Sequence, residues 1–121
     1  MGAGIALQFT RRYPLMKQEL LSHQLKVTDV VFYKEKHKHS VFNLITKEMF
    51  YHKPTRRDFN ETIINLKKVI TDSSINKLAI PLLGAGLDKL NWNITSDFIK
   101  ECFHDTALEI LVVRLGGLNG E

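Results

Sequence analysis

A glycine-rich loop with a carboxylate at its rim is the part of this sequence best suited to chemistry on a phosphate-bearing ligand. The loop Leu83–Asp88 closely follows the apolar run 78–81 and contains two glycines separated by one residue. Glycines there would let backbone amides approach a phosphate, because a larger side chain would block the contact. A second glycine pair, in residues 2–4, opens the chain. Two such loops indicate a nucleotide-like ligand that is held from both sides.

Periodic apolar patterns predict the helices and strands that must position these loops. The segment 56–71 places four apolar residues on one helical face, and Thr55 with Asp58 resembles a capping box at its start. The polar segment 35–40 separates two strand-like runs and so predicts a hairpin. The expected helices are 5–12, 14–24, 56–71 and 93–103, and the expected strands are 29–34, 41–47, 77–81 and 108–115.

Length and element order define the fold class. With 121 residues the chain has room for one domain and one core. After residue 55 the expected order is helix, strand, helix, strand, which predicts an α/β sandwich with parallel or mixed strand pairing. No apolar run approaches the roughly 18 residues that a membrane span needs, and the glycine-rich start does not match a signal peptide. We therefore expect a soluble, intracellular protein of the nucleus or cytoplasm, without a membrane partner.

The charge of the chain is modestly basic. There are 17 Lys and Arg against 13 Asp and Glu, which gives a formal net charge of +4. The basic residues lie in scattered clusters without interleaved aromatics, so they indicate a solvated surface and not a nucleic-acid interface. The lone Cys102 rules out an internal disulfide framework and agrees with a reducing compartment.

Motifs spread over nearly the whole chain resemble the macrodomain family. They are the start 1–6, the run 44–47 followed by 52–55, and the segment 81–88 with Trp92, in the family's order and at similar spacing. More narrowly, they look like the branch of the terminal ADP-ribose protein glycohydrolase, which also deacylates O-acyl-ADP-ribose. The resemblance implies a three-layer α/β/α sandwich around a mixed sheet that binds ADP-ribose at the carboxyl ends of its strands.

The resemblance also implies a mechanism. In that branch the lysine that matches Lys47 is the catalytic nucleophile, and the aspartate that matches Asp88 works with it. Carried over, Lys47 would attack the anomeric carbon of the distal ribose, and Asp88 would serve as acid and base. No metal and no redox cofactor is needed. The residues implied for substrate binding are Gly2, Ala3, Gly4, Ile5, Thr46, Leu82, Leu83, Gly84, Ala85, Gly86, Leu87 and Leu115.

The sequence departs from the family pattern at its start. The family normally continues upstream of Met1 by about two strands, and without them the strand 77–81 would lose a neighbour and expose unpaired backbone groups. Position 82 is also an uncharged leucine where relatives carry a basic residue. We therefore expect a macrodomain that is incomplete at its N-terminus, unless another segment fills the gap.

Each candidate residue also has a structural interpretation. Lys47 would otherwise be a surface lysine that closes a hairpin strand, and Asp88 would otherwise cap the turn before Asn91. The glycine pair of the loop alone would permit a tight strand-to-helix turn. Lys47 moreover needs desolvation or a proton acceptor, because a lysine is mostly protonated at neutral pH.

The histidines and the cysteine favour structural interpretations. His37 and His39 would share one face of an extended segment, but no third metal ligand follows at a recognised spacing, so we expect a solvated hairpin tip. Cys102 is interpreted as a small buried thiol on the last helix. A nucleophilic role for Cys102 with His104 is disfavoured, because a helix interior does not lower a thiol pKa as a helix start would.

These inferences lead to a hydrolase as the first functional hypothesis. It would remove mono-ADP-ribose from acidic side chains of proteins and deacylate O-acyl-ADP-ribose, acting as a monomer. The alternatives are a reader module that binds ADP-ribose without turnover and a short form that is inactive. A pure reader would need the glycine loops but not the pair of Lys47 and Asp88.

Overall fold

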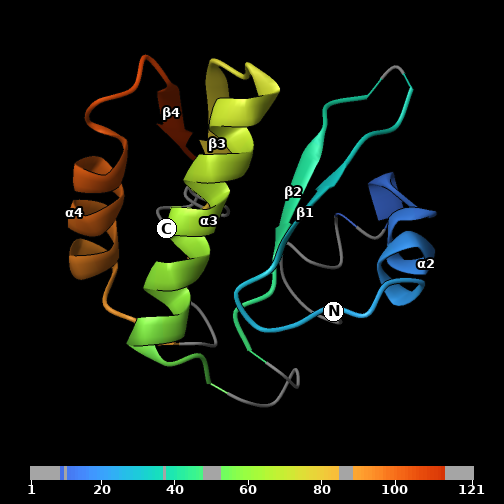
Figure 1. Ribbon diagram of the computed structural model, residues 1–121, viewed down its shortest axis with the longest axis horizontal. Coiled ribbons are helices and arrows are strands. Elements are labelled where there is room, and N and C mark those ends of the chain that lie inside the picture. The colour runs from blue at the N-terminus through green and yellow to red at the C-terminus, as the bar shows by residue number, and fades with distance from the viewer. Residues whose placement is uncertain (1–8, 10, 37, 48–52, 85–88, 114–121) are drawn as a thin grey trace, which may run out of the picture.

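The fold is known from a computed structural model, which describes residues 9, 11–36, 38–47, 53–84 and 89–113 (Figure 1). Within these ranges the helices and strands follow one another in the order that the sequence pattern predicts. The elements are α2 (Met16–Leu21), β1 (Val30–Tyr33), β2 (Val41–Leu44), α3 (Arg56–Ser73), β3 (Lys77–Ile80), α4 (Trp92–Phe103) and β4 (Glu109–Val112).

The described strands form two separate pairs. β1 and β2 are antiparallel, with Val30 opposite Leu44, which confirms the predicted hairpin. β3 and β4 are parallel, with Lys77 opposite Glu109, and α4 forms the crossover between them. In the described residues β3 pairs with β4 alone. The described strands thus form one antiparallel and one parallel two-stranded sheet.

Helices lie on both sides of the strands. In Figure 1, α3 and α4 are on one side, and α2 is on the other side of the hairpin. Alternate residues of each strand contact the helices on opposite sides, because successive side chains of a strand point to opposite faces. Val30 and Leu44 pack toward α3, whereas Tyr33 and Val41 pack toward α2. The arrangement agrees with the three-layer sandwich expected from the sequence.

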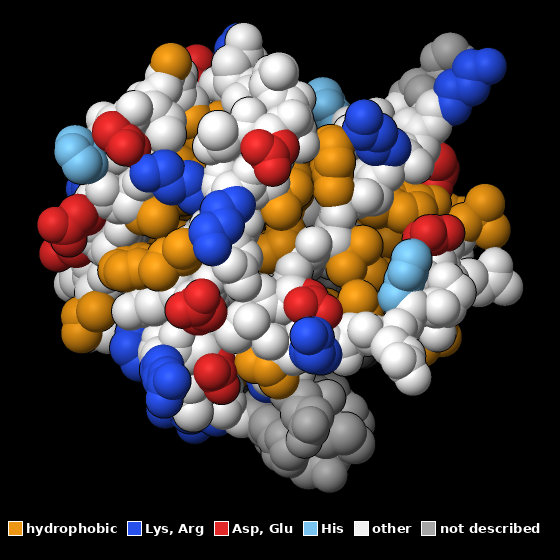
Figure 2. All heavy atoms as spheres, in the orientation of Figure 1, with side chains coloured by type: hydrophobic (Ala, Val, Ile, Leu, Met, Phe, Trp, Pro, Cys, Tyr) orange, Lys and Arg blue, Asp and Glu red, His pale blue; other side chains and the backbone are white. Residues whose placement is uncertain are grey.

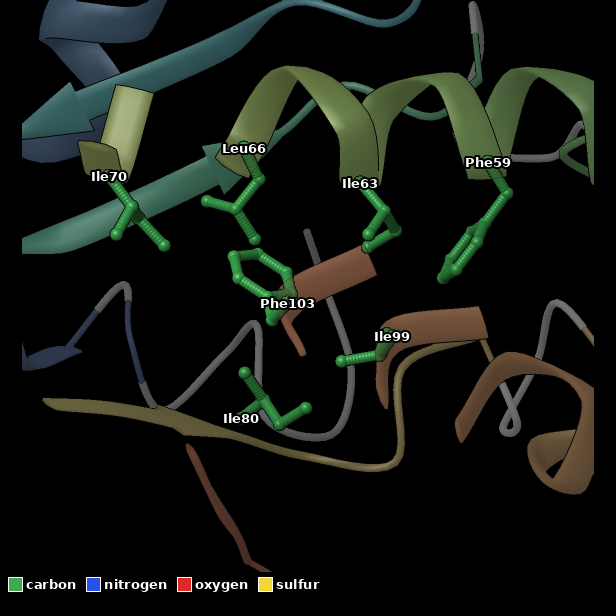
Figure 3. Close-up of a cluster of buried hydrophobic side chains, with 7 residues drawn as sticks. All are labelled: Phe59, Ile63, Leu66, Ile70, Ile80, Ile99 and Phe103. Carbon is green, nitrogen blue, oxygen red and sulfur yellow. The ribbon is translucent and has the colours of Figure 1, made fainter. Parts of the chain in front are cut away.

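The apolar stripe of α3 forms the centre of the main core (Figure 3). Ile63 has no exposed surface, and its stripe neighbours are also buried. Residues of this stripe recur three or four positions apart, so they share one helical face. Burying a side chain of this size contributes roughly 1.5–3 kcal/mol. The cluster consists of Phe59, Ile63, Leu66, Ile70, Ile80, Ile99 and Phe103.

Both long helices begin at side-chain caps. The Asp58 backbone N–H donates to the Thr55 side-chain oxygen at 3.0 Å, which confirms Thr55 as the N-cap of α3. The Asn91 side chain accepts from the Ile94 N–H at 3.2 Å, so α4 begins one residue earlier than predicted. α3 also continues two residues beyond the predicted end and stops at the left-handed Ser74.

The second of the two predicted N-terminal helices is shorter than expected. The helix expected over 14–24 is limited to Met16–Leu21, because Leu15 provides no side-chain cap and the Ser22 N–H bonds back to the Gln18 and Glu19 carbonyls. Of the helix expected over 5–12, only Phe9, Arg11 and Arg12 lie in the described residues, and they are helical.

The strands are also shorter than predicted. β2 ends at Leu44 and not at Lys47, because the ladder is irregular where the Thr28 N–H donates to the Ile45 carbonyl and the Ile45 N–H donates to the Asp29 carbonyl. Thr28 has a positive φ of 80°. Thr46 and Lys47 therefore lie beyond the regular strand, at its carboxyl end. β4 likewise begins one residue after the predicted start and ends at Val112.

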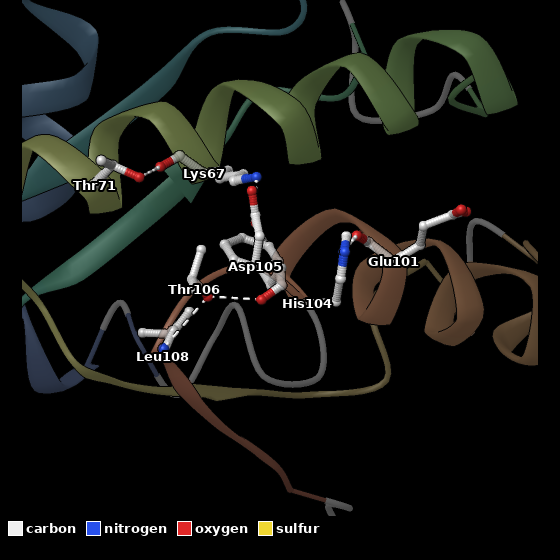
Figure 4. A network of polar contacts seen from close by, with 8 residues as sticks. Lys67, Thr71, Glu101, His104, Asp105, Thr106 and Leu108 are labelled. Atoms are coloured by element: carbon white, nitrogen blue, oxygen red, sulfur yellow. Dashed lines mark hydrogen bonds and ion pairs between the residues drawn. The ribbon is translucent and has the colours of Figure 1, made fainter.

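Polar contacts fix the turn between α4 and β4 against α3 (Figure 4). The Lys67 Nζ lies 2.8 Å from an Asp105 carboxylate oxygen. This hydrogen-bonded ion pair lowers the pKa of Asp105 and raises the pKa of Lys67. The Thr106 hydroxyl donates to the Phe103 carbonyl at 2.7 Å and accepts from the Leu108 N–H. Among the helices that the structure describes, none is long and apolar enough to cross a bilayer.

Candidate functional site

A groove of about 890 Å³ separates β2 from β3 and reaches the carboxyl ends of both strands. On the face shown in Figure 2, hydrophobic side chains come to the surface between α3 and the hairpin. Strand residues of β2 and β3 form the two walls, and α3 and the segment before α2 add further side chains. The described residues that line the groove are Phe9, Arg12, Tyr13, Met16, 39–44, Thr46, Phe59, Leu66, Ile75, 77–81, Leu83 and Gly84.

The structure brings together three of the residues implied by the family resemblance. Thr46 follows β2, whereas Leu83 and Gly84 follow β3, and all three line the groove. Lys47 and Leu82 are half-buried at the same two strand ends, although neither lines the groove itself. The carboxyl end of an open α/β sheet is where ligands of such folds bind. These two chain segments form the described part of the candidate site.

The backbone at Gly84 is shaped for a glycine. Its φ of +75° lies in the left-handed region, and an added Cβ would come within 2.9 Å of a Leu90 methyl and 3.2 Å of the Phe59 ring. The Leu90 N–H donates to the Gly84 carbonyl at 2.7 Å, which fixes the distance between the two ends of the segment 84–90. The local structure therefore requires the first of the two loop glycines.

Arg56 supports this end of the site, and sequence reasoning missed it. One guanidinium nitrogen donates to the buried Thr95 hydroxyl at 2.8 Å and another to the Asn91 carbonyl at 3.4 Å. The guanidinium also lies 5.7 Å from the centre of the Phe59 ring, within the range of a cation–π contact. Arg56 thus joins the first turns of α3 and α4. No sequence pattern pairs residues so far apart in the chain.

The groove has a cationic character in its described lining. Arg12 and Lys77 contribute positive charges, and the described lining residues include no carboxylate. Arg12 is exposed, in agreement with the solvated surface expected for the basic clusters, and the packing of Tyr13 and Met16 under the hairpin places it at the groove. An anionic ligand would be favoured electrostatically at this place.

The other candidate residues lie outside the described residues or in structural roles. His39 is exposed, and its carbonyl accepts from the Tyr13 hydroxyl, while His37 is not described. Cys102 is half-buried on α4, where burial raises the pKa of its thiol. Among the described residues no group of three metal-ligating side chains comes together. Gly2, Ala3, Gly4, Ile5, Ala85, Gly86, Leu87, Asp88 and Leu115 all lie outside the described residues.

Solved structures define the class of fold. The macrodomain of Thermus aquaticus DarG superposes with a TM-score of 0.83 at 27% identity, over 93% of this chain and 80% of that chain. Thermosipho africanus DarTG, solved in complex with ADP-ribose, has a TM-score of 0.80 at 16% identity and matches over 34% of its own length. The α/β class and the macrodomain fold are thereby confirmed, although no protein-family model matches the sequence.

Curated relatives define the branch. The human ADP-ribose glycohydrolase OARD1 is 35% identical over 115 residues, which are 95% of this chain and 74% of the human protein. The bovine protein of the same name matches to the same extent. The chain therefore belongs to the macrodomain family, in the branch of the ADP-ribose glycohydrolase OARD1.

Proposed function

We propose that this chain binds ADP-ribose at the carboxyl ends of β2 and β3. The observation that carries the proposal is that Thr46, Leu83 and Gly84 line one groove whose described lining is cationic. A glycine with a positive φ beside the groove favours close approach of a diphosphate to the backbone. The name of the human relative and the ADP-ribose complex of the DarTG structure support this choice of ligand.

The proposed reaction is hydrolysis of the ester between ADP-ribose and an acidic side chain of a protein. The Lys47 amine forms a bond to the anomeric carbon of the distal ribose, while the bond from that carbon to the ester oxygen breaks and the carboxylate leaves. Asp88 accepts the proton that the amine loses. Water then attacks the same carbon while the bond from that carbon to the Lys47 nitrogen breaks. Asp88 returns its proton to the amine and accepts the proton that water loses, which passes to solvent as ADP-ribose is released. O-acyl-ADP-ribose presents the same ester and would react alike.

The proposal also has a cellular part. The partners are ADP-ribosylated proteins and free O-acyl-ADP-ribose, and the enzyme acts as a monomer in the nucleus or cytoplasm. It binds neither a membrane nor a nucleic acid. Size-exclusion chromatography with light scattering, and imaging of the tagged protein in cells, test the oligomeric state and the location.

Replacing Lys47 by alanine is expected to abolish hydrolysis while ADP-ribose still binds. Removing a nucleophile lowers turnover by about 1,000-fold or more, whereas the strand-end contacts remain. The measurement is release of ADP-ribose from a glutamate-linked mono-ADP-ribosylated protein, with calorimetric binding of free ADP-ribose alongside. The Asp88→Ala variant is likewise expected to release no ADP-ribose from the modified protein.

Lys53→Ala is the matched control, because Lys53 is an exposed lysine outside the groove lining. Circular dichroism and a melting curve first establish that each variant is folded. Unchanged release by both Lys47→Ala and Asp88→Ala would contradict the mechanism. A folded wild-type protein that binds ADP-ribose but releases none would instead identify a reader module.

A further inference from the structure

The chain between Gly84 and α4 passes through a strained backbone conformation. Lys89 has a φ of 56°, in the left-handed region that is unfavourable for any residue with a side chain. Such a conformation persists only where the surrounding structure holds it in place. The Leu90 N–H, next along the chain, donates to the Gly84 carbonyl at 2.7 Å. The chain must also be held where it enters α4, because Leu90 leads directly into the first turn of this helix.

Arg56 provides the contact at the start of α4. Its guanidinium donates to the Thr95 hydroxyl at 2.8 Å and, over a longer distance of 3.4 Å, to the Asn91 carbonyl. Thr95 is only 1% exposed, so little water competes for its hydroxyl. The Asn91 carbonyl also accepts from the Thr95 N–H at 3.0 Å, within the first turn of α4. A single planar group on α3 therefore holds both ends of the first turn of the neighbouring helix, which lies beside α3 in Figure 1.

A second path from Arg56 to the glycine runs through Phe59. The guanidinium carbon lies 5.7 Å from the centre of the Phe59 ring. The same ring lies against Gly84, where an added Cβ would come within 3.2 Å of it. Arg56 thus supports Leu90 through Asn91, and it supports Gly84 through the aromatic ring.

The stability of α3 itself does not account for an arginine at this position. Arg56 is the first residue of the helix, where the helix dipole disfavours a positive charge. The Thr55 side chain already caps this end by accepting from the Asp58 N–H. The favourable contacts of Arg56 join α3 to α4, and they are therefore the physical reason for its presence.

We infer that Arg56 is a positioning residue of the ADP-ribose site. It fixes Asn91 and Leu90, and the Leu90 N–H in turn fixes the Gly84 carbonyl, so the backbone at Gly84 is in place before a ligand arrives. A site that is already held in its binding geometry loses less conformational entropy on binding. The inference rests on the proposed binding of ADP-ribose beside Gly84, which lines the groove.

Hydrogen exchange of the Leu90 amide, followed by NMR, tests the positioning without any ligand. Arg56→Met keeps an apolar stem over Phe59 but removes both hydrogen bonds, and exchange at Leu90 should become about tenfold faster or more. Thr95→Val removes only the hydroxyl partner and should change exchange in the same direction. The double variant should exchange about as fast as Arg56→Met alone, because both substitutions remove the same bond.

ADP-ribose affinity, measured by calorimetry, tests the consequence for the site. Arg56→Met and Thr95→Val should each bind about threefold more weakly or worse, since a smaller fraction of the protein has the binding geometry. Thr95→Val leaves every charge in place, so its loss of affinity cannot come from the net charge. In the release assay the larger effect should fall on KM and the smaller on kcat, the reverse of the expectation for Lys47→Ala.

Two control variants separate positioning from charge and from general stability. Arg57→Met removes an exposed positive charge one residue away and should bind ADP-ribose as the wild type does. Asp105→Asn removes the 2.8 Å contact to Lys67, which ties α3 to the chain at the far end of α4. It should leave both Leu90 exchange and ADP-ribose affinity unchanged.

The possible outcomes distinguish this inference from the proposed function. Unchanged Leu90 exchange in Arg56→Met, or wild-type affinity in both Arg56→Met and Thr95→Val, would overturn the inference while ADP-ribose binding stands. An equal loss of affinity in Asp105→Asn would also overturn it, because the effect would then be one of stability. If the folded wild type binds no ADP-ribose, the proposed function fails and the inference fails with it. Thr95→Val keeps the test decisive if Arg56→Met does not fold.

Discussion

At the scale of single residues, the backbone at Gly84 depends on the absence of a side chain. Leu90 and Phe59 approach it closely, and the Leu90 N–H bonds to its carbonyl. The terminal methyl of Leu90 could rotate away from an added Cβ, but the Leu90 Cβ at 3.3 Å and the Phe59 ring could move only with the core. The glycine is thus required by packing as well as by its φ.

Gly84→Ala is expected to destabilise the fold by about 1–2 kcal/mol, because an alanine at this positive φ is strained and crowded. Urea unfolding followed by circular dichroism measures the change. The affinity for ADP-ribose should fall in the same variant, since the loop would have to shift. An unchanged unfolding midpoint would show that the backbone here adapts freely.

The sequence predicted the site residues unevenly, and the reason is physical. Leu83 and Gly84 could be placed because they follow an apolar run, and the ends of such runs meet at one edge of a sheet, whereas Thr46 was implied only by the family resemblance. Arg56 could not, because its contacts with Thr95 and Asn91 depend on how two helices pack. The roles of Lys47 and Asp88 remain predictions that activity measurements must decide.

At the scale of elements, α3 has a favourable capping residue at its N-terminal end and an unfavourable one at its C-terminal end. Thr55 caps the start, but the end at Ser74 has a left-handed φ of 58° that suits glycine better than serine. The sequence pattern identified the apolar stripe of α3 correctly. It placed the end of the helix too early, because Asp72 and Ser73 are poor helix formers that the helix nevertheless includes.

Ser74→Gly is therefore expected to stabilise the protein by about 0.5–1 kcal/mol, since glycine adopts this backbone conformation without strain. Thermal and urea unfolding give the measurement. Ser73→Gly is the matched control one residue earlier, inside the helix, and it should destabilise by about 1 kcal/mol. Equal effects of the two variants would contradict the assignment of Ser74 as the left-handed cap.

Asp105→Asn should remove the ion pair that ties the turn after α4 to α3. Ion pairing lowers the pKa of Asp105 in the folded protein, so its contribution to stability is present above the unfolded pKa of about 3.9. That contribution is lost as the pH falls through the folded pKa. Because the pKa of Lys67 is raised, the contribution also fades as the pH rises through the folded pKa of this lysine.

The expected result is a modest stability difference between wild type and Asp105→Asn at pH 7 that disappears near pH 2. Urea unfolding at several pH values measures it. Asp72→Asn, at an exposed aspartate on α3, is the control and should not reproduce the pH dependence. A difference that persists in acid would assign the effect to something other than the ion pair.

At the scale of the whole molecule, the sequence predicted the order of the described helices and strands. The predicted hairpin and the parallel pair are both present. The two sheets nevertheless keep a macrodomain arrangement at a TM-score of 0.83. Hydrophobic periodicity could not predict the distance between the two sheets. That distance is set by how the strands pack on α3 and not by the sequence of either strand.

The pairing of Lys77 with Glu109 also has a kinetic consequence. The hairpin pairs Tyr33 with Val41 by closing a short loop. Pairing β3 with β4 closes a longer loop, because the whole of α4 lies between these strands in the chain. Closing the longer loop costs more chain entropy before any contact compensates for it. The hairpin and α3 are thus the natural early structures of the folding reaction, and the parallel pair, with the glycine loop that β3 carries, forms late.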